Sequence, residues 1–227
     1  MFPLNDTEPS RYSRVPVMTL AIMLANVLIL FAVIFLVDDY VAFFSTYGTT
    51  PRLILSRQGG GALSCVTSMF LHGGFGHLIN NMWALWVFGR RVEDACGSWR
   101  FLLFYLTCGI CADALSALVT ASSPTPSIGA SGALFGIMGA YLLLFPDGRI
   151  RTFVPVLFIP TFPKIRAFWI VFYSLALQIF PAINVALRRT DYRIGYWAHL
   201  GGFVGAILVF LFLRPEAFAR YWSDAQL

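Results

Sequence analysis

Six continuous apolar segments constrain the fold of this chain more than any other feature of its sequence. A helix of about 20 apolar residues spans the hydrocarbon core of a bilayer, which is about 30 Å thick. In lipid each backbone amide needs a partner within the protein, so a spanning chain forms helices or a closed barrel. The six runs lack the alternation of barrel strands, and they predict an all-α membrane protein built as a six-transmembrane-helix bundle. The spans are expected over Val17–Val37, Gly73–Gly89, Phe101–Thr120, Ile128–Phe145, Ala167–Leu187 and Ile194–Leu213.

The composition agrees with lipid as the main solvent of the chain. Charged residues make up 12% of the 227 residues and the mean hydropathy is +0.73, whereas a soluble domain carries about 25% charged residues. With six spans, 11 of the 16 Lys and Arg residues fall in loops on the side of the N-terminus. The positive-inside rule then places both termini in the cytoplasm. The net charge of +5 is thus explained by topology, and no nucleic-acid partner is expected.

The segments outside the spans indicate one membrane domain over residues 17–213. The first 16 residues are polar and are expected to be mobile, and residues 214–227 are expected to form a short cytoplasmic tail. The outer connection from Asp38 to Leu71 is rich in aromatic residues, so we expect it to lie partly in the membrane interface. The apolar connection between the fourth and fifth spans contains three prolines, which exclude a regular spanning helix there.

Three of the predicted spans carry polar residues near one end. His77 and Asn81 lie four residues apart in the second span and share a helix face. Ser131 lies at the start of the fourth span and His199 near the start of the sixth. With the N-terminus inside, all three spans begin at the outer leaflet, which puts these residues at a similar depth. Polar groups inside a membrane are costly and are candidates for function, although an interhelical hydrogen bond would explain any single one of them.

This set contains the groups that acyl transfer requires. A serine hydroxyl becomes a nucleophile when a base, most often His, takes its proton, and the oxyanion that follows needs preorganised donors. Ser131 and His199 are the candidate nucleophile and base. The Ser131 amide, the His77 ring and the Asn81 side chain are candidate oxyanion donors. The alternative for a serine beside glycine in a membrane helix is a purely packing role.

Two G-x-x-x-G patterns predict close packing of the fourth and sixth spans. Gly132 and Gly136 form one pattern, and Gly201 and Gly205 form the other. Small residues at this spacing let helix backbones approach one another. We expect this packing to bring Ser131 within reach of its base.

No carboxylate accompanies the candidates as the third member of a triad. Asp113, in the third span, is the one acidic residue inside any predicted span. Its role stays open between a structural hydrogen bond, an aqueous contact and the orientation of a histidine. Cys108 and Cys111 lie one turn apart in the same span without a nearby histidine, so we interpret them as packing residues. We expect no metal and no cofactor.

Three stretches of the chain resemble motifs of the rhomboid intramembrane serine proteases. GASGALFG (Gly129–Gly136) is similar to the family's G-x-S-G motif, HGGFGHLINN (His72–Asn81) to its H-x4-H-x3-N pattern, and WAHLGGFVGA (Trp197–Ala206) to its A-H-x-x-G motif. Each motif alone is weak, but the three occur in order and on the expected spans. The resemblance covers residues 17–213.

The resemblance implies a role for each matching residue. Ser131 would be the nucleophile and His199 the base of a Ser–His dyad, which agrees with the missing carboxylate. His77 and Asn81 would support the oxyanion, together with Gly129. The remaining motif and packing positions are His72, Gly132, Phe135, Gly136 and Gly202.

Three details compare this chain with the family pattern. Phe135, one turn after the nucleophile, occupies the place of an aromatic residue that stacks on the base. Ala206 replaces a family glycine, which still permits close packing. The first outer loop lacks the Trp-Arg pair that some members carry, so the anchoring of this loop is left open.

By resemblance, the chain is an intramembrane serine endopeptidase that cleaves transmembrane segments of single-pass membrane proteins near the outer leaflet of a bilayer. The compact six-span form favours a bacterial plasma membrane. One alternative is a non-proteolytic rhomboid-like protein that binds transmembrane segments. Another is a transporter or channel that uses its histidines as a proton relay, which the absence of internal repeats disfavours.

Overall fold

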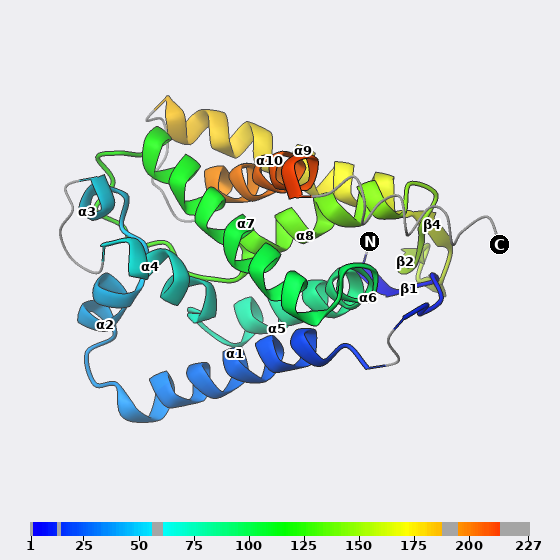
Figure 1. Ribbon diagram of the computed structural model, residues 1–227, viewed down its shortest axis with the longest axis horizontal. Coiled ribbons are helices and arrows are strands. Elements are labelled where there is room, and N and C mark those ends of the chain that lie inside the picture. The colour runs from blue at the N-terminus through cyan, green and yellow to red at the C-terminus, as the bar shows by residue number, and fades with distance from the viewer. Residues whose placement is uncertain (1, 13–14, 56–60, 188–194, 214–227) are drawn as a thin grey trace.

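The computed structural model describes residues 2–12, 15–55, 61–187 and 195–213 (Figure 1). Within them, three helices are long and apolar enough to cross a membrane: α1 (Val17–Leu36), α7 (Ser98–Val119) and α9 (Ala167–Ala186). Two more helices, α8 (Ser131–Leu144) and α10 (Tyr196–Leu213), are also apolar. The outer connection is folded into α2 (Tyr40–Tyr47), α3 (Pro51–Leu55), α4 (Gly61–Thr67) and the 3-10 turn η1 (Ser68–Phe70).

A helix occupies each of the six predicted spans. The second span is α5 (Phe75–Ala84), which continues through the π-helical turn η2 (Leu85–Gly89) into α6 (Arg90–Cys96). The helix of the fourth predicted span, α8, begins three residues later than expected because Gly129 has a φ of +120°, outside the helical range. The protein is therefore mostly helical. The number of membrane crossings and the side on which each terminus lies remain predictions.

A small sheet corrects two of the expectations drawn from the sequence. β2 (Arg149–Val156) pairs antiparallel with β1 (Phe2–Asp6), β3 (Ile159–Thr161) and β4 (Lys164–Arg166). The fold is thus not all-α, and the N-terminal segment is not mobile over Phe2–Asp6. The proline-containing connection forms strands instead of a span, as its prolines predict. The tail predicted for residues 214–227 lies outside the described residues.

The N-terminal strand is attached to the bundle by salt bridges as well as by the sheet. The buried Asp6 carboxylate accepts hydrogen bonds from Arg90 and Arg91 at the start of α6. β1 and the connection between α8 and α9 consequently lie at one end of the bundle, and α2 and α3 lie at the other (Figure 1). This arrangement agrees with the prediction that the N-terminal segment and the connection between the fourth and fifth spans lie on the same side of the membrane.

The start of α1 is capped from a different helix. Pro16 precedes α1 and offers no capping side chain. Glu93 of α6, almost fully buried, accepts the backbone N–H groups of Met18 and Thr19 at 2.8 and 2.7 Å. The first amides of a helix have no acceptor within the helix, and a negative charge is favourable there. Glu93 therefore fixes the N-terminal end of α1 against α6.

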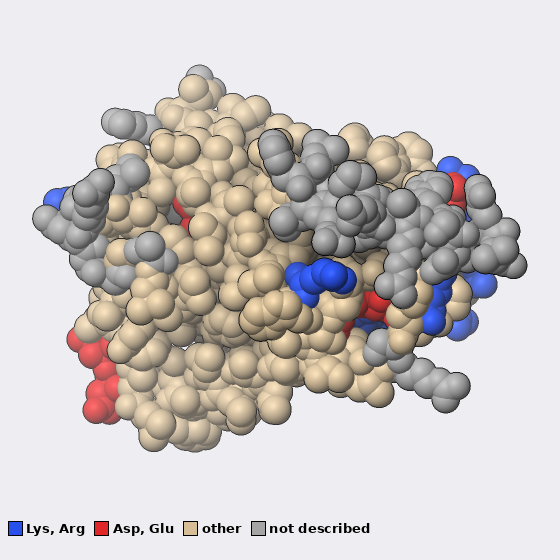
Figure 2. Space-filling model, viewed as in Figure 1, with Lys and Arg blue, Asp and Glu red and all other residues tan. Residues whose placement is uncertain are grey.

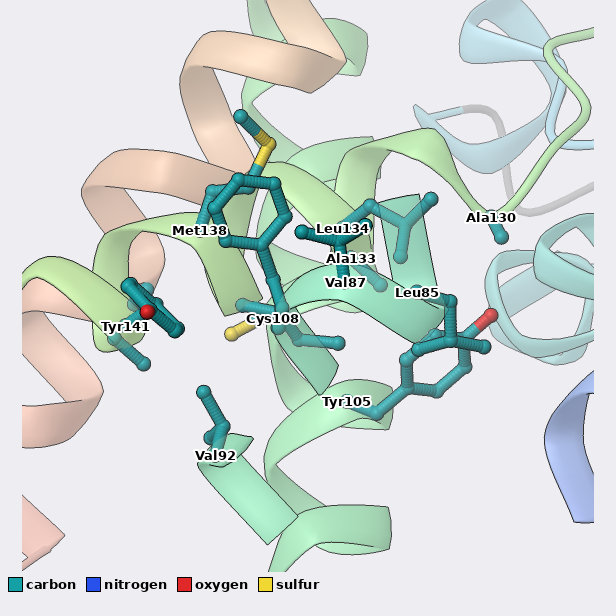
Figure 3. Close-up of a cluster of buried hydrophobic side chains, with 14 of the residues drawn as sticks. Leu85, Val87, Val92, Tyr105, Cys108, Ala130, Ala133, Leu134, Met138 and Tyr141 are labelled. Atoms are coloured by element: carbon teal, nitrogen blue, oxygen red, sulfur yellow. The ribbon is translucent and has the colours of Figure 1, made fainter. Parts of the chain in front are cut away.

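The core lies where η2, α6, α7 and α8 meet (Figure 3). Tyr105 of α7 and Tyr141 of α8 are fully buried there, beside Leu85 and Val87 of η2. Large apolar side chains on α1 and α9 instead face outward, among them Leu24 and Phe180. On the face shown in Figure 2 the surface along α1 carries no charged side chain, and most charged groups lie toward the two ends, with one basic group near the middle. An uncharged apolar belt of this kind is what a lipid-facing surface requires.

Glycines bring α8 and α10 into backbone contact. A Cβ atom on Gly202 would lie 1.8 Å from the carbonyl oxygen of Gly132, and one on Gly136 would lie 3.0 Å from the carbonyl oxygen of Gly202. The predicted close packing of these helices is therefore confirmed. The second G-x-x-x-G pair serves a different contact, because Gly205 faces Cys111 of α7, where a Cβ would meet the Cys111 Cβ at 2.5 Å. Cys111 is thus a packing residue, as expected.

Candidate active site

Ser131 and His199 form a hydrogen-bonded pair. Ser131 is the first residue of α8, and its Oγ atom lies 2.8 Å from Nε2 of His199 in the first turn of α10. His199 is buried, and Ser131 is half-buried. The two residues are 68 positions apart in the chain. The glycine contact between α8 and α10 is what brings them together.

The His199 ring is held on two further sides. Phe135, one turn after Ser131, stacks on the ring with centroids 4.7 Å apart and planes inclined by 18°. The Nδ1 atom of His199 lies 2.8 Å from Oε1 of Gln178 on α9. The stacking was expected from the sequence, but Gln178 was missed. The signal that would have found it is a polar side chain inside a predicted span.

His77 and Asn81 lie close to Gly129, the residue two before Ser131. A Cβ atom on Gly129 would lie 2.7 Å from His77 Nε2 and 3.4 Å from Asn81 Nδ2. The backbone at Gly129 also needs a positive φ, so glycine is required here on two grounds. Its own N–H donates to the carbonyl oxygen of Ser68 at 2.9 Å. Gly129 therefore lets α5 approach the start of α8 without itself supplying a free donor.

His72 orients the Asn81 side chain through a hydrogen bond. It is buried, its ring lies edge-on to His77 at 4.9 Å, and its Nε2 accepts from Asn81 Nδ2 at 2.8 Å. Burial, with His77 as a second cause, lowers the pKa of His72 to about 4, so the ring is neutral at neutral pH and keeps an acceptor for Asn81. Only one of the two Asn81 amide hydrogens is used in this bond, and the other remains for a ligand.

A cavity of about 780 Å³ connects these groups. His77 and Asn81 line it from α5, Ser131 and Phe135 from α8, and Gln178 from α9. Its volume falls within the range of ligand sites in proteins, about 300–1,000 Å³. These residues belong to the second, fourth and fifth predicted spans.

The start of α8 adds donors to this cavity. The first amide of α8 to bond within the helix is that of Leu134, which donates to Ala130. The amides of residues 131–133 therefore have no acceptor within the helix, and they carry the positive end of its dipole. A negatively charged oxygen that develops beside Ser131 would be stabilised there.

Asp113 of α7 holds the outer connection in place through hydrogen bonds. Its Oδ2 atom accepts from Thr49 Oγ1 at 2.6 Å and from Ser68 Oγ at 3.1 Å, and its side chain is buried. Ser68 in turn accepts the Gly129 amide through its carbonyl. Thr49 also pairs with Ser127 through two backbone hydrogen bonds. These contacts anchor the first outer loop, whose anchoring the sequence left open, and they tie it to the segment that precedes Ser131.

Replacing Asp113 with alanine is expected to lower the free energy of unfolding by about 1–3 kcal/mol, because two buried side-chain hydrogen bonds to its carboxyl group are lost. Asp113→Asn keeps an acceptor oxygen and should lose much less. Thermal unfolding in detergent micelles measures both, with Asp147→Ala, at an exposed carboxylate, as the control. Equal melting temperatures for Asp113→Ala and the wild type would contradict this role.

Comparison with known proteins agrees with this geometry. The rhomboid domain family matches residues 60–216, more than half of the chain. The chain belongs to the rhomboid family. Among relatives of this rhomboid, Rhomboid protein 1, mitochondrial, of Saccharomyces cerevisiae is 36% identical over 150 residues, which are 64% of this chain and 40% of that protein. Rhomboid protease GluP of Bacillus subtilis is 49% identical over 84 residues, 37% of this chain and 16% of that protein.

A third relative, RHOMBOID-like protein 6, mitochondrial, of Arabidopsis thaliana, is 33% identical over 167 residues, 70% of this rhomboid and 47% of that protein. This rhomboid thus spans less than half the length of each of these three relatives. Two of them are named as mitochondrial proteins. The relatives therefore do not support the bacterial plasma membrane that the sequence favoured, whereas family and apolar helices together indicate an integral membrane protein.

Proposed function

We propose that this rhomboid is an intramembrane serine endopeptidase, with Ser131 as the nucleophile and His199 as the general base. The observation that carries this proposal is the 2.8 Å contact between Ser131 Oγ and His199 Nε2 inside a cavity. This distance is within the reach that a nucleophile and its base require. The name of the B. subtilis relative as a protease supports the same reaction class.

The proposed reaction proceeds in two stages at Ser131. Ser131 Oγ forms a bond to the carbonyl carbon of the scissile peptide while His199 Nε2 takes the hydroxyl proton. The tetrahedral intermediate collapses, the C–N bond breaks, and His199 returns the proton to the leaving amine. A water molecule then attacks the acyl carbon while His199 takes its proton. The bond from this carbon to Ser131 Oγ breaks, His199 returns the proton to Oγ, and the carboxylic acid product leaves. No metal or cofactor takes part in this sequence of steps.

The oxyanion of the tetrahedral intermediate is assigned to donors around Gly129. The amide of Ser131 at the start of α8, the free N–H of the Asn81 side chain and the His77 ring converge on this part of the cavity. Fixed donors of this kind stabilise developing charge without reorganisation. His72 supports the reaction by keeping Asn81 in place.

The proposed substrates are transmembrane segments of single-pass membrane proteins. Such a segment reaches Ser131 from the bilayer through the cavity between α5, α8 and α9. With six spans and cytoplasmic termini, cleavage takes place near the outer leaflet.

A serine-directed fluorophosphonate probe tests the proposal. The purified wild-type protein should be labelled, Ser131→Ala should not, and Ser174→Ala should be labelled as the wild type is. Ser174 is a matched control because it also lines the cavity, but its hydroxyl donates to a backbone carbonyl of its own helix. An unlabelled wild-type protein that still binds transmembrane peptides would instead identify a non-proteolytic member of the family.

A further inference from the structure

We infer that Gln178 of α9 is a positioning residue that takes the place of the carboxylate of a catalytic triad, an inference that rests on the proposed function. Its Oε1 atom lies 2.8 Å from Nδ1 of His199. Gln178 touches the base and not the reacting bond. The inference is that it fixes both the tautomer and the orientation of the His199 ring.

The hydrogen bonds around Gln178 determine which way its amide faces. Its Nε2 atom donates to the carbonyl oxygen of Ser174, one turn earlier on α9, at 3.2 Å. Because the nitrogen is used in this bond, the oxygen faces His199. An amide oxygen only accepts, so Nδ1 of His199 carries the proton. Nε2 of His199 is then left with its lone pair directed at Ser131 Oγ.

Three contacts from two helices thus determine the pose of the ring. On α8, Phe135 stacks on one face of the ring and Ser131 is hydrogen-bonded to Nε2. On α9, Gln178 is hydrogen-bonded to Nδ1. Without the contact to Gln178, the ring could rotate about its Cβ–Cγ bond or adopt the other tautomer. Rotation would place a C–H group against the serine hydroxyl and the other tautomer an N–H group, and either change would remove the base.

An amide suits this site better than a carboxylate does. His199 is buried in a bundle of apolar helices, where an ionised carboxylate loses its hydration. Asp113, the acidic residue in the described lining of the cavity, is already bound to Thr49 and Ser68. A neutral acceptor orients the ring without that cost. It does not add a negative charge to stabilise the imidazolium, and this difference is what an experiment can detect.

Two variants separate positioning from a merely structural role. Gln178→Leu removes the acceptor and should lower the rate of fluorophosphonate labelling and of substrate cleavage about tenfold or more, in kcat rather than in KM. Gln178→Glu keeps an acceptor oxygen but adds a negative charge beside His199. Because an adjacent negative charge favours the protonated ring, the acid limb of the pH–rate profile should move to higher pH by about one unit or more.

The matched control is Asn184→Leu on the same helix. The Asn184 amide donates to the carbonyl of Phe180 one turn earlier, as Gln178 does to Ser174, and it forms no bond to His199. The other titratable groups that line the cavity among the described residues are His77, Asp113 and Tyr173, and they are the same in all variants. A shift of the pH profile between Gln178→Glu and the wild type therefore reports the new charge.

The outcomes distinguish this inference from the proposed function. If the wild type and Asn184→Leu are both inactive, the proposed function fails. If both are active and Gln178→Leu equals them in rate, only the positioning role is overturned. A Gln178→Glu variant whose acid limb coincides with that of the wild type would also overturn it, even if Gln178→Leu is impaired. Melting temperatures measured in parallel show that each variant is folded.

Discussion

Alanine in place of Ser131 is expected to lower the cleavage of a single-span substrate on the order of 10⁶-fold, to the background rate. The reason is that the proposed acyl-enzyme forms on Ser131, whose hydroxyl is hydrogen-bonded to the base, whereas the Ser174 hydroxyl in the same cavity donates to a backbone carbonyl. Losses of this size follow removal of a catalytic serine or histidine in other enzymes. His199→Ala should cause a loss of similar size because the serine hydroxyl then keeps its proton. Cleavage in liposomes, with the new termini sequenced, measures both.

The double variant Ser131→Ala/His199→Ala is the sharper part of this prediction. Residues that act as one unit have strongly non-additive effects, so the double variant should be no slower than either single variant. If the losses instead multiply, or if either single variant keeps more than a small fraction of the activity, Ser131 and His199 do not act as a pair. Ser174→Ala serves as the control, since it removes a hydroxyl from the cavity without touching His199.

Gly202→Ala is expected to reduce cleavage about 100-fold without altering any proposed catalytic group. The new Cβ atom would lie 1.8 Å from the carbonyl oxygen of Gly132, so α10 must move away from α8 by about 1 Å or more. Because His199 lies on α10 and Ser131 on α8, this movement lengthens the contact between them. A misplacement of about 1 Å can lower a rate by about 100-fold.

Gly76→Ala is the matched control for this substitution. Gly76 lies in α5 next to His77, but a Cβ atom there meets nothing within 4 Å. This variant should keep the wild-type rate, and alanine is also the better helix former. Rates are compared at a temperature at which both variants remain folded. A Gly202→Ala protein with wild-type activity would mean that the α8–α10 contact does not set the distance between Ser131 and His199.

The sequence alone was sufficient for the helices, for the family and for the chemical identity of most candidate residues. Continuous apolar runs of about 20 residues leave the chain few alternatives in lipid, and each run contains a helix in the structure. The pairing of Ser131 with His199 could also be anticipated, because glycine patterns mark the helix faces that approach closely. These features are local or periodic, so they can be read along the chain.

Only the tertiary structure decided the contacts between segments that lie far apart in the chain, because no periodic pattern in the sequence indicates them. The N-terminal strand lies in a polar segment of the chain and carries no motif, yet it pairs with β2 because that strand offers an edge for it. Asp113 binds the outer connection rather than a histidine, because the hydroxyl groups of Thr49 and Ser68 lie within hydrogen-bond distance of its carboxylate. Gln178 carries no motif, and only the packing of α9 beside α10 brings its amide to His199. A hydrogen bond depends on distances of a few tenths of an ångström, and those distances are set by the packing of whole helices.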